Sequence, residues 1–222
     1  MISIRSFFPS LPENSSSAAD SGQIISLNNR PPDDVYDKIK KETGADKIYR
    51  LSVFLTDKEQ LLFAAPAGPD IISGLEDLEF CAKAGFSLIQ KLGIKPEIGI
   101  ISGGRAGDLG RDKTVDQTIL TAEALEAKLN SEGISAKHYT ILIEDAIKET
   151  NFLILPDSLS GEMILKTVAG VGEGVEIGNI LLLKPPVGET MSDSRIYIEQ
   201  LTKKADLKNL DILKEVLAIL HL

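Results

Sequence analysis

The stretch that decides the fold runs from Asn151 to Arg195: NFLILPDSLSGEMILKTVAGVGEGVEIGNILLLKPPVGETMSDSR. It contains two near-continuous apolar runs, Phe152 to Leu155 and Ile177 to Leu183, each bounded by turn residues. Such runs are typical of strands whose two faces are both covered by helices. We therefore expect two central strands followed by the turns Pro156-Asp157-Ser158 and Lys184-Pro185-Pro186. In open α/β sheets, ligands bind at such carboxyl ends.

The segments on either side of this stretch alternate between strand and helix patterns. On the amino-terminal side we predict helices at 33–43, 70–92 and 114–131, and strands at 48–55, 61–65, 98–101 and 139–143. The strands at 48–55 and 61–65 are expected to form a hairpin. On the carboxyl-terminal side, 196–204 and 207–222 are predicted as helices. This alternation indicates an α/β fold with a mostly parallel sheet sandwiched by helices.

The composition limits the class of function. A chain of 222 residues with 43% hydrophobic content buries a substantial core. The formal net charge of -9 argues against binding to nucleic acid, which needs clustered Lys and Arg. No signal peptide is visible, and no apolar run approaches the ~20 residues that span a bilayer. We expect a soluble cytoplasmic protein with no nucleic-acid and no membrane partner.

Cys81 is the only cysteine, so the chain forms no internal disulfide and a reducing compartment is expected. It lies in the apolar stripe of the predicted helix 70–92, which favours a buried structural thiol over a nucleophile. His138 and His221 have no Cys, Asp or Glu at metal-ligand spacing, so no metal site is predicted. The sequence also shows no plausible Ser-His-Asp set.

A glycine-rich loop is the first candidate binding site. It follows the predicted strand 98–101 and begins Ser102, Gly103, Gly104, Arg105. Its backbone N–H groups and the arginine charge are suited to an anion, whereas a flexible loop without a ligand is the alternative. A second glycine-rich segment, Gly170 to Gly174, follows a helix and precedes a strand. Because a dinucleotide fingerprint has the opposite order, we interpret that segment as a turn.

Several short motifs resemble, in order and spacing, those of the phosphate acetyltransferase and butyryltransferase family. They are LGIKP at 92–96, FLILPD at 152–157, Ser160-Gly161, Lys166, IGNI at 177–180 and Lys184-Pro185. The resemblance implies a fold akin to the isocitrate and isopropylmalate dehydrogenases, with two domains and an active cleft between them. Because this chain is shorter than that family's, it implies a reduced first domain.

The resemblance also implies site residues. In that family a Ser and an Arg of the corresponding loop bind acyl phosphate beside coenzyme A, and Ser194 and Arg195 match them. A guanidinium beside a hydroxyl suits bidentate recognition of phosphate or carboxylate. The position of the family's aspartate is Leu201 here. The catalytic residues are thus Ser194 and Arg195, coenzyme A is the implied cofactor without a metal, and the substrate-binding residues are Ser102, Gly103, Gly104, Arg105, Asp157, Gly161 and Lys184.

A shorter branch of the family is more similar. The segment GVGEGVEIGN before an apolar strand and KPP resembles the methanogenesis marker proteins of the MtxX type, which carry the name of methyltransferases. This resemblance implies methyl transfer linked to methanogenesis in an archaeal cytoplasm. Three functions stay open: a transferase of the MtxX type, a phosphate acyltransferase acting on acyl-CoA and phosphate, and a non-catalytic member that binds a metabolite or partner.

We predict a loose segment at 1–30 and an α/β domain at 31–222. Within it, 67–183 is the central subdomain, and helices at 194–222 return to the reduced first subdomain. The apolar stripe of the last helix, Leu210, Leu213, Leu217 and Leu220, docks either on its own domain or on a second subunit. The expected partners are a small anionic substrate and, under the second alternative, another copy in a homodimer.

Overall fold

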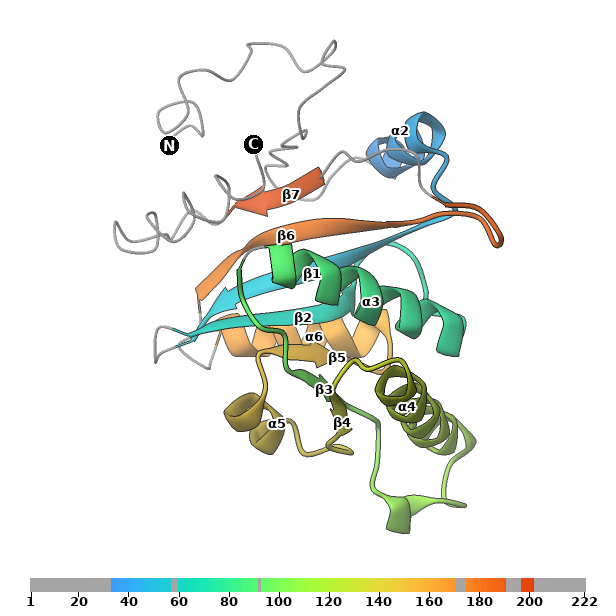
Figure 1. Cartoon of the computed structure of the whole chain (residues 1–222), viewed down its shortest axis with the longest axis vertical. Helices are drawn as coiled ribbons and strands as arrows, with labels where there is room; N and C mark the ends of the chain where they lie inside the picture. Colours follow the sequence, from blue (N-terminus) through green and yellow to red (C-terminus); the bar gives the residue numbers. More distant parts are fainter. Residues whose placement is uncertain (1–32, 57–59, 92, 171–174, 191–196, 202–222) are drawn as a thin grey trace.

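The structure, a computed structural model, describes residues 33–56, 60–91, 93–170, 175–190 and 197–201. Within these ranges one sheet forms the centre of the protein, with helices on both faces (Figure 1). The strands are β1 (Lys47–Leu55), β2 (Leu61–Ala67), β3 (Ile98–Ile100), β4 (Ala136–His138), β5 (Phe152–Ile154), β6 (Val175–Lys184) and β7 (Tyr197–Leu201). The helices are α2 (Asp33–Thr43), α3 (Leu75–Lys91), α4 (Lys113–Ser131), α5 (Ile143–Glu149) and α6 (Ser158–Gly170), with a 3₁₀ turn at Ala106–Asp108.

The strand order is β4-β3-β5-β2-β1-β6-β7. β5 is parallel to both β2 and β3, and β3 is parallel to β4, whereas β1 is antiparallel to both β2 and β6, and β7 is antiparallel to β6. The predicted α/β fold is confirmed, with a sheet that is mixed rather than built mainly of parallel ladders. The strands β2, β3, β4, β5 and β6 nevertheless run in one direction, because β2 and β6 are both antiparallel to β1, which lies between them.

That shared direction places the candidate turns at one edge. β5 and β6 do not pair with each other, but they run the same way, and each has a strand on both sides. The turns after β3, β5 and β6 therefore emerge at the same edge of the sheet, which we call the carboxyl edge.

Alternate side chains of each strand enter different cores. One face packs against α3 and α4 through residues such as Leu51, Phe63 and Phe152. The other face packs against α5 and α6 through residues such as Phe54 and Leu153, and against α2 through a smaller cluster around Ile48. The prediction that helices cover both faces of the central strands is confirmed, and this double burial explains the nearly continuous apolar runs of the sequence.

Two sequence predictions are wrong. Residues 197–201 form β7 instead of part of a helix at 196–204, because β6 offers an edge with which they pair, in the register Ile180↔Ile198 and Leu181↔Tyr197. The strand predicted at 139–143 is absent, since β4 ends at His138 and Thr140 has a φ of 59° that turns the chain into α5. The segments 1–30 and 207–222 lie outside the described residues, and the predicted subdomain boundaries stay predictions.

Candidate functional site

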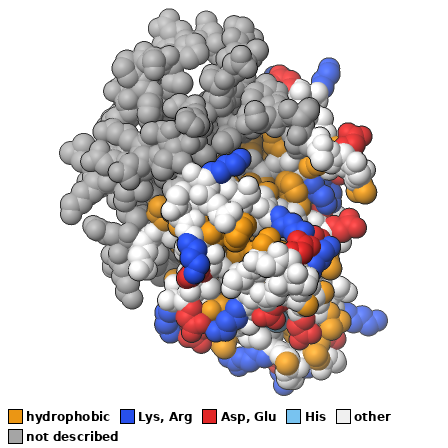
Figure 2. Space-filling model, in the orientation of Figure 1, with side chains coloured by type: hydrophobic (Ala, Val, Ile, Leu, Met, Phe, Trp, Pro, Cys, Tyr) orange, Lys and Arg blue, Asp and Glu red, His pale blue; other side chains and the backbone are white. Residues whose placement is uncertain are grey.

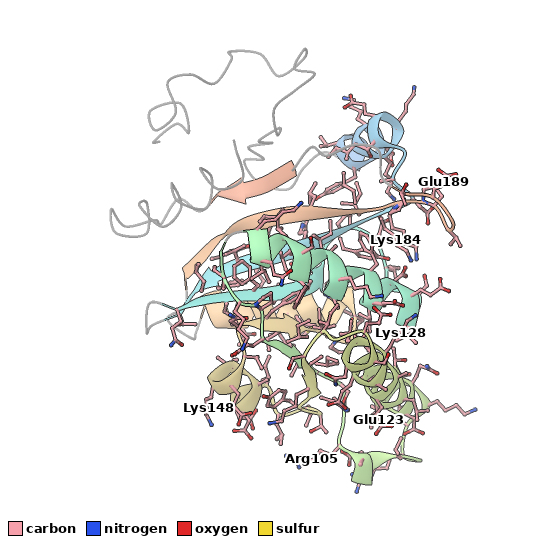
Figure 3. The ribbon with its side chains drawn as sticks, viewed as in Figure 1. Arg105, Glu123, Lys128, Lys148, Lys184 and Glu189 are labelled. Atoms are coloured by element: carbon pink, nitrogen blue, oxygen red, sulfur yellow. The ribbon has the colours of Figure 1, made fainter. Side chains whose placement is uncertain are left out.

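The structure gathers the predicted substrate-binding residues at the carboxyl edge but spreads them along it. Ser102 to Arg105 follow β3, Asp157 and Gly161 follow β5, and Lys184 ends β6. Four strand spacings separate β3 from β6 in the sheet, which at about 4.8 Å each amounts to about 19 Å. Figure 3 likewise shows Arg105 and Lys184 in well-separated parts of the molecule. One phosphate group cannot contact both.

Lys184 belongs to a half-buried ion cluster built around the buried Asp77. Its ammonium group binds one carboxylate oxygen of Asp77, on α3, while the ammonium of Lys47 binds the other oxygen at 2.7 Å. Lys47 also donates to the Ser73 hydroxyl at 2.7 Å, and the Ser73 N–H donates to Asp77 at 2.8 Å. The Asp77 carboxylate thus holds two lysines from neighbouring antiparallel strands at a fixed position on the carboxyl edge.

The loop between β2 and α3 extends this cluster. The carboxylate of Asp70 accepts from the Ile48 N–H at 2.6 Å and pairs with the Lys40 ammonium at 2.8 Å. The Asp70 carbonyl accepts from the Ser158 hydroxyl at 2.9 Å, which joins the loop to the first residue of α6. In this edge cluster of Lys40, Lys47, Lys184, Asp70 and Asp77, three ammonium groups face two carboxylates. One positive charge is in excess.

The electrostatics of the cluster depend on Asp77. Burial alone would raise the pKa of its carboxyl, but hydrogen bonds from Lys184, Lys47 and the Ser73 N–H outweigh burial and hold the pKa well below its usual range. The Tyr49 hydroxyl is buried without a hydrogen-bond partner among the described residues. Burial first, and then the negative charge of Asp77, raise the Tyr49 pKa far above its usual value. Asp77 is therefore ionised at neutral pH, and Tyr49 is a neutral phenol.

Asp157 and Gly161 have structural roles at the start of helix α6. The Asp157 carboxylate accepts from the Ser160 N–H at 2.8 Å and from the Ser160 hydroxyl at 2.7 Å, so it caps the helix. A Cβ atom on Gly161 would lie 2.2 Å from the Pro66 carbonyl oxygen. Glycine is required there because α6 crosses β2 at backbone contact.

The glycine loop after β3 is internally bonded. Gly103 donates its N–H to the Thr118 hydroxyl at 2.8 Å, and Gly104 packs so closely on α4 that a Cβ atom would lie 2.7 Å from a Val115 methyl group. The Arg105 N–H donates to the Asp108 carboxylate at 2.9 Å, and the Arg111 guanidinium donates to the same carboxylate at 2.6 Å. The loop's donors therefore already hold a carboxylate, which is the protein's own.

His138 was not predicted as a site residue, yet the structure brings its Nε2 to 2.8 Å from the Ser102 Oγ. β3 and β4 are adjacent and parallel, in the register Ile100↔His138, so their ends meet. Burial lowers the His138 pKa, and the nearby Glu126 and Glu123 of α4 partly oppose that shift. Sequence alone gives no signal for this contact, because 36 residues separate the partners and the strand order decides it.

Asp77 was also missed, although a signal exists. It lies four residues before Cys81 and eight before Gly85, on the stripe of α3 that is buried. A carboxylate at a buried position of a helix requires a cation or hydrogen-bond donors nearby. That requirement points to lysines on the strands beneath the helix.

The described residues limit other kinds of site. None of their His, Cys, Asp and Glu side chains form a group of three or more that would hold a metal ion. No described helix has the length and apolarity needed to cross a membrane. On the face drawn in Figure 2, Lys and Arg side chains are interspersed with Asp and Glu. The predicted catalytic residues Ser194 and Arg195 lie outside the described residues.

The fold is that of the phosphotransacetylases. EutD phosphotransacetylase from Staphylococcus aureus superposes with a TM-score of 0.62 at 14% identity, covering 91% of this chain and 63% of that one. A branched-chain phosphotransacylase from Enterococcus faecalis superposes with a TM-score of 0.63 at 12% identity, covering 90% and 74%. Identities this low show the fold alone.

In sequence, the chain is similar to the "Putative methyltransferase mtx subunit X" of two methanogens. It is 43% identical to the Methanosarcina acetivorans protein over 145 residues, 65% of this chain and 52% of that protein. It is 42% identical to the Methanosarcina barkeri protein over 146 residues, 66% of this chain and 54% of that protein. The chain spans about half the length of these relatives, and no family model matches it. The predicted resemblance to the MtxX branch of a phosphate acetyltransferase-like fold is confirmed.

Proposed function

We propose that this chain is a cytoplasmic transferase of the mtx subunit X type, a methyltransferase linked to methanogenesis, and that its substrate is an elongated anion bound along the carboxyl edge. One observation carries the proposal: the shared direction of β3, β5 and β6 brings the glycine loop and the edge cluster to one side of the sheet. The excess positive charge of the edge cluster favours an anion there. The 43% identity to a relative with the methyltransferase name supports the transferase class.

The length of the substrate follows from the spacing of the two regions. The glycine loop contains the Arg105 N–H and the Arg111 guanidinium, which both pair with Asp108, and the edge cluster contains the ammonium groups of Lys47 and Lys184, which both pair with Asp77. The substrate would take the place of Asp108 in the loop and add to the bonds of the two lysines. With about 19 Å between β3 and β6, a ligand that contacts both regions carries anionic groups at two well-separated positions. Coenzyme A, implied by the family resemblance, is a suitable probe of this kind.

The first experiment is calorimetric titration of the full chain with inorganic phosphate and with coenzyme A. Replacing Arg195 by Ala is expected to weaken phosphate binding by about 10-fold or more, because a hydrogen bond to a charged group is worth roughly 1.5–3 kcal/mol. Lys148→Ala is the matched control, since it removes a positive charge at the end of α5, where the chain enters the opposite edge of the sheet. Unchanged phosphate affinity in Arg195→Ala contradicts the proposed role of this residue.

Amide hydrogen exchange tests the elongated footprint. Coenzyme A is expected to protect amides both in Ser102–Arg105 and in the turn after Lys184. Inorganic phosphate, at a concentration too low to fill both regions, is expected to protect amides in only one of them. Protection confined to a single region with coenzyme A contradicts an elongated ligand that bridges the edge.

A phosphate acyltransferase is the second candidate function, because the superposed structures are named phosphotransacetylase and phosphotransacylase. The assay is formation of acetyl-CoA from acetyl phosphate and coenzyme A by the full chain. Steady turnover above an Arg195→Ala control supports this candidate and excludes the non-catalytic alternative. Anion binding without turnover counts against the phosphate acyltransferase and is compatible with both the methyltransferase proposal and the non-catalytic alternative.

A further inference from the structure

The Ser102 hydroxyl has two partners, and together they fix the direction of every hydrogen bond around it. Its Oγ lies 2.9 Å from the Gly104 carbonyl oxygen and 2.8 Å from the His138 Nε2. The residue is 1% exposed, so water does not compete for either contact. These contacts join the ends of β3 and β4 to the first turn of the glycine loop.

Counting hydrogens assigns the donors. A carbonyl oxygen only accepts, so the single hydroxyl hydrogen of Ser102 goes to Gly104. The contact with His138 then uses the imidazole as donor, which in the neutral ring requires the Nε2–H tautomer; the charged ring also carries a hydrogen on Nε2. The chain of bonds runs from His138 Nε2–H to Ser102 Oγ and from Ser102 Oγ–H to the Gly104 carbonyl. In this geometry His138 is not a base for Ser102, so the pair is not a nucleophile with its activator.

We infer that His138 is a positioning residue for the glycine loop: through Ser102 it fixes the peptide plane that presents the Arg105 N–H to an anionic group. This inference rests on the proposed function, in which the loop contacts one end of an anionic substrate. It adds a residue that contacts no ligand itself but orients the donor that does.

The link from His138 to the anion is the geometry of one peptide group. In a planar trans peptide the carbonyl and the following N–H point in opposite directions. The Gly104 carbonyl is held toward the buried Ser102, so the Arg105 N–H points away from it, and it donates to the Asp108 carboxylate at 2.9 Å. A carboxylate thus occupies the place that this donor offers. A phosphate or carboxylate of the substrate binds there by taking the position of Asp108.

Helix α4 supports the same arrangement from the other side. Glu126 accepts from the backbone N–H of His138 at 2.9 Å, which fixes the end of β4. The Thr118 hydroxyl accepts from the Gly103 N–H and donates to the Val115 carbonyl. The ends of β3 and β4 are therefore both attached to α4. The imidazole of His138 then sets the direction of the Ser102 hydroxyl.

The first test measures the tautomer directly. The chain has only two histidines, so the ring nitrogens of His138 are readily assigned in a nitrogen-detected NMR spectrum of the full chain. At a pH above its titration, the Nε2–H tautomer is expected. A dominant Nδ1–H tautomer would mean that Nε2 accepts from Ser102, which overturns the inference.

The second test compares His138→Gln with His138→Leu. Gln keeps an amide N–H near the position of Nε2, whereas Leu has no donor and leaves the buried Ser102 oxygen with one bond fewer. In His138→Leu we expect amide exchange at Arg105 about 5-fold faster and phosphate binding about 5-fold weaker, the effect of one lost hydrogen bond. His138→Gln is expected to restore both to within 2-fold of the parent chain, about 0.4 kcal/mol.

The outcomes separate this inference from the proposed function. Faster Arg105 exchange in His138→Leu, with rescue in His138→Gln, supports the positioning role. This holds even if neither the parent chain nor any variant binds phosphate, because a lack of phosphate binding refutes only the proposed function. Parental exchange in His138→Leu overturns the inference, whatever the phosphate affinity. If His138→Leu does not fold, Ser102→Ala breaks the same chain of bonds at its middle atom, and the same exchange measurement at Arg105 decides.

Discussion

Replacing Asp77 by Asn tests whether the edge cluster stabilises the fold as the structure indicates. The Asp77 side chain is 3% exposed and pairs with two ammonium groups, of which Lys47 is 25% and Lys184 14% exposed. Asn keeps nearly the same volume and can still accept from the Ser73 N–H. What it removes is the negative charge between the two lysines.

The expected loss of stability is about 3 kcal/mol. Removing one partner of a buried ion pair costs about 3–5 kcal/mol, because the other charge is left without compensation. The lower figure applies here, since both lysines keep partial access to water. For a chain of this size, that loss corresponds to a drop in Tm of roughly 6–12 °C.

Urea unfolding followed by far-ultraviolet circular dichroism at pH 7 measures the change, with Asp145→Asn as the control. Asp145 pairs with Lys148 on the exposed side of α5, so its substitution is expected to cost less than about 1 kcal/mol. A loss below 1 kcal/mol for Asp77→Asn would refute the reasoning, because it would mean that the two lysines need no carboxylate.

The pH dependence gives a second check on Asp77. Its pKa in the folded protein lies well below the value of about 3.9 in an unfolded chain. The stability that this difference supplies is fully present above about pH 4 and is lost as the pH falls further. The gap between the parent chain and Asp77→Asn should therefore be constant from pH 5 to 8 and narrow below pH 4.

Three further predictions follow from single contacts. Gly161→Ala is expected to destabilise the fold by about 1–3 kcal/mol, since its Cβ would overlap a backbone carbonyl of β2. Gly107 has open space around it, so Gly107→Ala is the control and should change the free energy of unfolding in urea by less than about 0.5 kcal/mol. The buried Cys81 thiol, whose pKa burial raises, should resist alkylation at pH 8 until urea unfolds the chain; rapid labelling of the native protein would contradict its burial. Burial lowers the His138 pKa, so this residue does not affect the free energy of unfolding above about pH 6.5 and lowers it as the pH falls below that value. His138→Gln should remove this pH-dependent loss of stability. An identical pH profile for the variant and the parent chain would count against the prediction.

The sequence alone determined most of the elements. The apolar runs at 152–155 and 177–183 predicted buried strands, because a strand covered on both faces has no polar alternation. The hairpin of β1 and β2, and helices such as α2 with Gly44 at its end, were predicted from period and turn residues. These signals are local, so one chain segment is enough to carry them.

The contacts that build the site were decided by tertiary structure. The pairing of Ser102 with His138 depends on β3 and β4 being neighbours, and the attachment of Lys184 to Asp77 depends on α3 lying over β6. The strand β7 was predicted as a helix because its pairing with β6 lies outside the segment from which the helical period was read. Residues that are 16 apart (Leu181 and Tyr197) to 107 apart (Asp77 and Lys184) meet only where strand order and helix packing bring them together, and a pattern of local periodicity contains no information about either.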